Sequence, residues 1–444
     1  MSIQLRFPRP YLAEGEIEIP TEVYEQPYRQ RIRELRRELV LPGFRPGQVP
    51  AEVVMAKHGE ALLTELLTQY FLQALDEGLG GRRLVGFPYY IRRPEELRVQ
   101  PPFPSYRYEV RALVVPSEAL SVEGIRPIRY LYQAQEGDVA LYQRYLRVAF
   151  GQLEPLDTLP AVLPVDKEVI VRLRWEAPSA FEPIRLSWTT LSQPFPWTYI
   201  AERKVGEKLQ LPPQALLSYV DLIRAELPDF SPLTVEDVSV TVVSAAQVSP
   251  LSLEELVQQL DLSSFEGMSQ EEIWKALLDR QVNRLLQGLN TRSHQIHFLH
   301  AAGVRIPEDL VQYNYLLYLR ERSGNNGHLR SYEEYRLDLA WQIFFASYAF
   351  HEPALAISDE EVQNEVWDRL KTAPDLSPEA QELLLRLESS EDERKGFLET
   401  FIGKQGESLR RSMQLVRFDE WLTTRFGPAQ EQYLPLNVLS LRLL

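Results

Sequence analysis

Several common chemical features are absent from this chain. It has no cysteine among its 444 residues, which excludes disulfide bonds and catalysis by a thiolate. No stretch approaches 18 uninterrupted apolar residues, and residues 1–18 contain no apolar segment of the kind that a secretory signal needs. These absences predict a cytoplasmic protein without a membrane partner.

Nucleotide-binding and hydrolytic motifs are also missing. The sequence contains no GxxxxGK(S/T), no GxGxxG after a strand pattern, no GxSxG and no HExxH. We therefore expect neither an ATP-driven machine nor a bound cofactor, and we assign no catalytic residue.

Three histidines, His294, His297 and His300, are spaced like candidate metal ligands. On a helix, steps of three residues lead backwards around the surface, so these side chains fan out and do not converge on one ion. Residues 281–300 contain no Asp or Glu that could complete a site. We therefore expect no metal and interpret the three as solvated or core histidines.

The charge of the chain is unevenly distributed. Its net charge is −15, and residues 251–444 contribute 31 acidic and 20 basic side chains. Residues 29–57 instead hold seven cations and three anions, a local excess of four positive charges. Such a patch attracts phosphate backbones, while the acidic remainder argues against a general nucleic-acid binder. A solvated basic helix face would produce the same pattern.

The segment inside this basic region is Gly43-Phe44-Arg45-Pro46-Gly47-Gln48-Val49-Pro50, between two helical patterns. The glycines permit left-handed or crowded backbone, and the prolines fix φ. A rigid turn of this kind would present Phe44 and Arg45 outward, and a guanidinium binds phosphate oxygens bidentately. The alternative is an ordinary helix hairpin whose Phe44 tucks under the domain.

The pattern Gly-Phe-Arg-x-Gly-x-x-Pro resembles the ribosome-docking signature of the bacterial trigger factor family, a family of ribosome-associated chaperones. Pro46 stands where the family commonly has a second cation. The resemblance implies a ribosome-binding site made of Gly43, Phe44, Arg45, Pro46 and Gly47. A supporting basic patch is expected from Arg33, Arg36 and Arg37.

The order of the remaining patterns predicts an α+β multidomain protein. Two short strands, 2–7 and 15–19, precede a helix expected from Pro27 to about Leu39. A second helical pattern ends at the glycines of 78–81, and residues 106–114 alternate as a half-buried strand. We predict a small α+β docking domain at 1–115 and a linker with a helix at 116–165.

The middle region, 166–248, is predicted to be β-rich, with residues 167–175 pairing with 235–243. The family carries an FKBP-type prolyl isomerase domain here, and residues 204–207 resemble its turn before a strand. The Ile-Pro-Gly-aromatic segment that walls the family's proline pocket has no counterpart in this sequence. Pro194 to Trp197 and Tyr199 supply aromatic side chains in a different pattern, and core packing is the favoured role for Trp188, Trp197 and Tyr199. We predict a degenerate FKBP-like domain and leave enzymatic activity open.

Residues 249–444 are predicted to be a helical, arm-bearing domain. Five Ser-x-x-Glu capping boxes start apolar-periodic runs, at Ser252, Ser269, Ser331, Ser358 and Ser390. Turns are expected at residues 303–307, 324–327 and 374–378, and the segment 303–308 also resembles the family's C-terminal domain.

The leading hypothesis is an ATP-independent, ribosome-associated chaperone that docks near the exit tunnel and shields nascent chains. The resemblance implies exit-tunnel protein and RNA of the ribosome and unfolded nascent polypeptides as partners, and it allows a homodimer away from the ribosome. The alternatives are a peptidyl-prolyl isomerase whose helical regions recruit substrate, and a scaffolding protein without a client.

Overall fold

The computed structural model divides the chain into two compact units. The first joins Met1–Ser121 to Ile306–Trp421, and the second joins Val122–Arg305 to Leu422–Leu444. The structure describes the whole chain except residues 40–41, 43, 46–47, 93, 95–96, 123–124, 163–166, 178–183, 192–196, 213–223, 226–237, 261, 263–264, 266, 323–328, 373–376, 428 and 437–444. The architecture is mixed α and β, as the sequence predicts.

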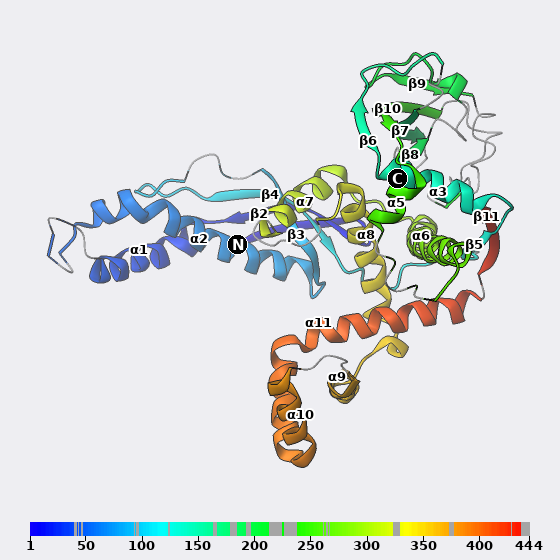
Figure 1. The fold of residues 1–444 in the computed structure, drawn as a ribbon. Coiled ribbons are helices and arrows are strands. Elements are labelled where there is room, and N and C mark those ends of the chain that lie inside the picture. The colour runs from blue at the N-terminus through cyan, green and yellow to red at the C-terminus, as the bar shows by residue number, and fades with distance from the viewer. Residues whose placement is uncertain are drawn as a thin grey trace. The chain divides into compact units, whose positions relative to one another are not determined.

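The first unit begins with a four-stranded antiparallel sheet whose strand order is β1-β2-β4-β3. Two long helices, α1 and α2, pack on one face of this sheet (Figure 1). The predicted alternation of 106–114 is confirmed, because Tyr106, Tyr108 and Val110 lie in the core beneath the helices. The elements are β1 (Ser2–Arg9), β2 (Leu12–Ile19), α1 (Thr21–Glu38), α2 (Ala51–Leu79), β3 (Leu84–Arg92) and β4 (Tyr106–Val114).

The predicted start of the first helix was wrong. Helix α1 begins at Thr21, and Pro27 lies inside it. The proline removes one backbone hydrogen bond of the helix, but Tyr24 and Tyr28 on either side of it are fully buried against the sheet. Tertiary packing on both sides of the proline therefore keeps the helix continuous.

The rest of the first unit is helical. Reciprocal Ser–Glu hydrogen bonds form at the starts of α8 and α9, and at Ser390 only the bond from the Glu393 amide to the serine is present, at 3.4 Å. Bonds from the Ser358 backbone and from Arg417 lower the pKa of Glu361 to about 2. The elements are α7 (Glu308–Arg322), α8 (Tyr332–Ala349), η4 (Pro353–Leu355), α9 (Asp359–Thr372), α10 (Pro378–Ser389) and α11 (Glu391–Phe426), whose last turn lies in the second unit.

The second unit contains a five-stranded antiparallel sheet of order β6-β10-β7-β8, with β9 also paired to β10. The predicted pairing of 167–175 with 235–243 is confirmed in part. Leu173 lies opposite Val242 and Trp175 opposite Val240, whereas residues 168–172 pair with 244–248. Residues 235–237 lie outside the described residues. Two capping boxes, at Ser252 and Ser269, are complete. The elements are α3 (Asp138–Ala149), β6 (Gln152–Pro155), β7 (Glu168–Ala177), β8 (Ile184–Leu191), η1 (Trp197–Tyr199), β9 (Lys208–Leu211), β10 (Val238–Ser249), α5 (Leu253–Gln259) and α6 (Gln270–Ala301).

A parallel two-stranded sheet pairs β5 (Ile128–Gln133) with β11 (Gln430–Pro435) in the second unit. Neither strand was expected from the sequence. Among the described residues of 250–444, β11 is the one strand and the other regular elements are helices. Asn290 of α6 accepts a hydrogen bond from the Tyr130 backbone amide at 2.6 Å and donates to its carbonyl at 3.0 Å. Among the residues that the structure describes, no helix is long and apolar enough to cross a bilayer.

Candidate functional site

The first candidate site lies on the hairpin of α1 and α2, which run side by side in Figure 1. The hydroxyl of Tyr24 donates to the Pro104 carbonyl at 2.6 Å, and that of Tyr28 donates to the Val99 carbonyl at 3.3 Å. Burial raises the pKa of Tyr28 to about 12, so its hydroxyl stays protonated and can donate this hydrogen bond at neutral pH. A Cβ at Gly59 of α2 would lie 2.7 Å from the Tyr28 hydroxyl, so only glycine lets the helices approach this closely. The hairpin is therefore a firmly packed support for the loop between its helices.

The loop itself is described in part, because Gly43, Pro46 and Gly47 lie outside the described residues. Val49 is completely buried in the core of the sheet and helices. The Gln48 amide donates to the Arg45 carbonyl at 2.9 Å, which closes a turn. Phe44 is 39% exposed, and Arg45 is exposed as well. The predicted outward presentation of these two side chains is confirmed, whereas their role in binding stays a prediction.

The basic side chains of α1 differ in their surroundings. Arg29 forms an ion pair with Glu25 at 2.7 Å and lies 5.6 Å from the ring centre of Phe103. Arg33 and Arg37 are exposed, while Arg36 is half-buried. Within the described part of the chain, no ion pair engages Arg33, Arg36, Arg37 or Arg45. An anionic partner could therefore reach Arg33, Arg37 and Arg45 most readily.

A second candidate surface, which we call the α9–α11 groove, was not expected from the sequence. It is an open hollow of about 460 Å³ in the first unit, and its floor is apolar. Phe397 and Phe401 are four residues apart on α11 and both half-buried, so they face the groove together. The other apolar residues of the lining are Val366, Leu370 and Leu409, and its polar residues are Arg369, Gln405, Ser408 and Ser412. In the sequence, the one feature that could have indicated this surface is the spacing of Phe397 and Phe401 by four residues.

The aromatic side chains of the middle region lie in different surroundings. Trp197 is half-buried and packs against the core of the second unit, which confirms its expected role in packing. Tyr199 is 36% exposed, so the expectation of core packing was wrong for this residue. The 194–196 segment and the side chain of Trp188 lie outside the described residues.

The three histidines do not form a metal site in the described structure, where no group of three potential ligands comes together. Burial, followed by the nearby His297, lowers the pKa of His294 to about 4, so its imidazole is neutral at pH 7. The Nε2 atom of His297 lies 2.9 Å from the Arg224 carbonyl.

Comparison with known proteins bears on the hairpin. Residues 1–140 match the family model described as bacterial trigger factor protein. Through these residues the chain is similar to the trigger factor family. The trigger factor of Azospirillum brasilense is 37% identical over 71 residues, which are 16% of each chain. That of Microcystis aeruginosa is 31% identical over 87 residues, 18% of each chain. These matches span less than a fifth of either relative.

A solved structure of a family member aligns more broadly but less closely. It comes from work on "Promiscuous Substrate Recognition in Folding and Assembly Activities of the Trigger Factor Chaperone". The alignment covers 94% of this chain and 99% of that one, at 14% identity and a TM-score of 0.31.

Proposed function

We propose that this protein is an ATP-independent chaperone that docks on the ribosome near the exit tunnel and shields nascent chains in the cytoplasm. The observation that carries the proposal is the exposed pair Phe44–Arg45, held on a firmly packed hairpin within the residues that match the family. An aromatic ring and a guanidinium side by side suit a surface of protein and RNA, because the ring packs and the fork binds phosphate.

In this proposal residues 1–115 are the docking domain, 116–165 a linker with a helix, 166–248 a degenerate FKBP-like domain and 249–444 the client-binding domain. The partners are exit-tunnel protein and RNA and unfolded nascent polypeptides, with a homodimer as a form away from the ribosome. The direct test is whether the intact protein co-sediments with ribosomes and dissociates as the salt concentration rises, as phosphate contacts require.

The α9–α11 groove supports the client-binding part of the proposal. Its apolar floor and polar rim suit brief contacts with apolar segments of many sequences, and several weak contacts together retain a chain while each stays releasable. Its lining mixes aliphatic and aromatic side chains with a guanidinium and hydroxyls, so it selects for no single side chain.

We expect the intact protein to delay aggregation of a diluted, denatured client without nucleotide. Replacing both Phe397 and Phe401 with alanine should reduce this protection several-fold, because each truncation removes apolar surface that a client would cover. Fully burying one such side chain contributes roughly 1.5–3 kcal/mol. Light scattering measures the effect. The matched control replaces the exposed Leu385 and Val416, outside the groove lining, with alanine. A nucleotide requirement would contradict the ATP-independent mechanism, and equal losses in both double variants would contradict the role of the groove.

We further expect little prolyl isomerase activity. The pocket-walling segment has no counterpart in the sequence, and a site that does not hold the twisted amide better than the planar one cannot accelerate its rotation. Uncatalysed isomerisation takes roughly 10–100 s, so even weak catalysis is measurable in a protease-coupled peptide assay. Acceleration like that of a dedicated isomerase would support the enzyme alternative, and Trp197 and Tyr199 would then be the first residues to replace.

A further inference from the structure

One face of α7 contacts the docking-domain sheet through residues about 200 positions away in the sequence. Asp309 and Tyr313 lie four residues apart on one side of the helix, and Asn314, next to Tyr313, also contacts the sheet. Each contacts a different partner by a different interaction: an ion pair to Arg111, ring packing with Tyr89 and hydrogen bonds to Phe87. All these residues belong to the first compact unit.

The donor and acceptor atoms of the Asn314 side chain all form hydrogen bonds. Its side chain is completely buried. Its Oδ1 accepts from the Phe87 amide at 2.7 Å, and its Nδ2 donates to the carbonyls of Phe87 at 3.2 Å and Leu310 at 3.0 Å. Both amide hydrogens and the oxygen therefore have partners, and a flipped amide would lose the bond to the Phe87 N–H.

The sheet is shaped to receive this asparagine. Phe87 lies in an irregularity of the edge strand β3, between Val85 and Tyr89, where the register with β4 shifts. Gly86 has φ +71°, and a Cβ there would lie 2.5 Å from the Asn314 Oδ1. The bulge leaves both backbone groups of Phe87 available, and Asn314 occupies the position that a further strand would take.

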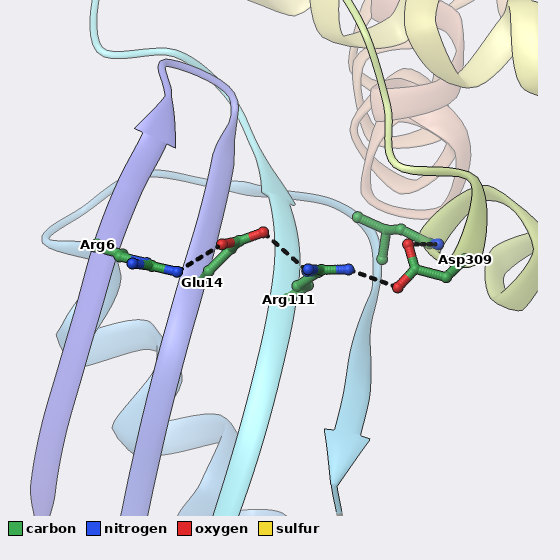
Figure 2. Close-up of polar contacts among 5 residues, drawn as sticks. Arg6, Glu14, Arg111 and Asp309 are labelled. Atoms are coloured by element: carbon green, nitrogen blue, oxygen red, sulfur yellow. Dashed lines mark hydrogen bonds and ion pairs between the residues drawn. The ribbon is translucent and has the colours of Figure 1, made fainter. Parts of the chain in front are cut away.

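The second contact is ionic. Figure 2 shows a chain of side chains that crosses the outer face of the sheet from Arg6 through Glu14 and Arg111 to Asp309. The nitrogen–oxygen distances along it are 3.4, 2.8 and 2.7 Å. Arg111 thus bridges a carboxylate of the sheet and one of α7. Asp309 also accepts a hydrogen bond from the Leu310 amide at 3.0 Å, in the first turn of the helix, where negative charge is favourable.

The third contact is between aromatic rings. The ring centres of Tyr89 and Tyr313 lie 5.1 Å apart at an interplanar angle of 51°. Such pairs add a modest stabilisation beyond that of the area that they bury.

We propose that Asn314 and Asp309 are positioning residues that latch α7 to the sheet, so that the docking hairpin and the α7–α8 hairpin move as one body. Only the functional role of the latch rests on the proposed function. If the protein docks on the ribosome through α1 and α2, the latch would hold the α7–α8 helices at a fixed orientation to the docking hairpin. The two contacts of the latch differ in kind. The contact of Asn314 is buried and neutral, whereas the ion pair of Asp309 with Arg111 is partly exposed.

The absence of cysteine makes a distance measurement direct. Cysteines introduced at the exposed positions Glu65 on α2 and Gln312 on α7 would be the only two in the chain, and spin labels on them report the distance between the two helices. In the otherwise unchanged protein we expect one narrow distance distribution. Asn314→Leu, of similar volume but without hydrogen bonds, should broaden it and add longer distances. In the parent, salt should weaken the ion pair between Asp309 and Arg111 and so broaden the distance distribution slightly. Asp309→Asn should broaden the distribution less than Asn314→Leu does, and salt should then have no further effect on it.

Hydrogen exchange supplies a second readout at the site. Loss of the hydrogen bond to Asn314 should speed exchange of the Phe87 amide by roughly tenfold or more, because the amide then lacks its partner in a buried position. Gly86→Ala should also broaden the distance distribution, because its new Cβ would collide with the Asn314 Oδ1. Added to Asn314→Ala, which removes that oxygen, Gly86→Ala should cause less further broadening than it causes in the parent.

The latch is refuted if distances and exchange in both Asn314→Leu and Asp309→Asn match those of the parent at an unchanged melting temperature. If Asn314→Leu fails to fold, Asp309→Asn alone decides, because its side chain is partly exposed. These measurements use free protein, so they are independent of ribosome docking. We expect Asp309→Asn to co-sediment with ribosomes like the parent, since it leaves the α1–α2 loop intact.

Discussion

Replacing Phe44 and Arg45 together with alanine should lower the affinity for ribosomes by roughly a thousandfold, because anchoring aromatic and arginine side chains each contribute about 2 kcal/mol or more at an interface, and about 1.4 kcal/mol is a factor of ten. The melting temperature should hardly change. Phe44 is 39% exposed and Arg45 is exposed, so little of the core depends on either side chain. Co-sedimentation with ribosomes at several protein concentrations gives the affinity, and calorimetry gives the melting temperature.

The matched control for this pair is Leu316→Ala with Arg322→Ala on α7. It also removes one exposed apolar side chain and one exposed guanidinium, but outside residues 1–140. We expect it to bind ribosomes like the parent. Equal binding by the Phe44–Arg45 variant and the parent would show that the loop does not dock.

The salt dependence separates the two components of docking. Removing an arginine that contacts phosphate should lower the slope of log affinity against log salt by about 1. Arg33→Ala and Arg37→Ala should have this effect, because both side chains are exposed near the end of α1. Arg36→Ala should have a smaller one, since Arg36 is half-buried.

Local features of the fold could be predicted from the sequence where one pattern decided the structure. The alternation of 106–114 predicted β4, and the Ser-x-x-Glu pairs predicted helix starts that the hydrogen bonds confirm. The strands β3, β5, β6 and β11 were missed. Gly86 and Pro88 break the alternation of β3, and β11 is a strand of 6 residues whose partner β5 lies far away in the sequence.

The sites depended on contacts that no local pattern encodes. The exposure of Phe44 could be predicted because the loop that carries it is a short, recognisable motif. Asn314 looks like any polar residue on an amphipathic helix, and only the fold brings it to Phe87, 227 residues away. The packing of residues 306–421 with 1–121 in one unit is likewise a property of the folded chain. The division into four domains stays a prediction.

Phe418→Ala should be among the most destabilising single substitutions in the first unit. Phe418 is completely buried at the centre of an aromatic cluster that joins α11 to α8. The ring centres of its neighbours lie between 5.3 and 6.0 Å from its own, and they belong to Trp341, Phe344, Phe345, Tyr348 and Trp421. Rigid rings on several sides cannot collapse into the space left by the truncation. The expected cost is about 3–5 kcal/mol, a large fraction of the stability of a typical domain.

Urea unfolding followed by tryptophan fluorescence measures this loss, because Trp341 and Trp421 adjoin the substituted side chain. Phe418→Leu should recover most of the stability, since leucine refills much of the cavity. The control is Phe397→Ala, which truncates a half-buried phenylalanine of the same helix in the α9–α11 groove and should shift the midpoint far less. If Phe418→Ala unfolds at the same urea concentration as Phe397→Ala, α11 is not held to α8 by this cluster. If it is held there, the groove that α11 lines loses its support in Phe418→Ala, and protection of clients should fall along with stability.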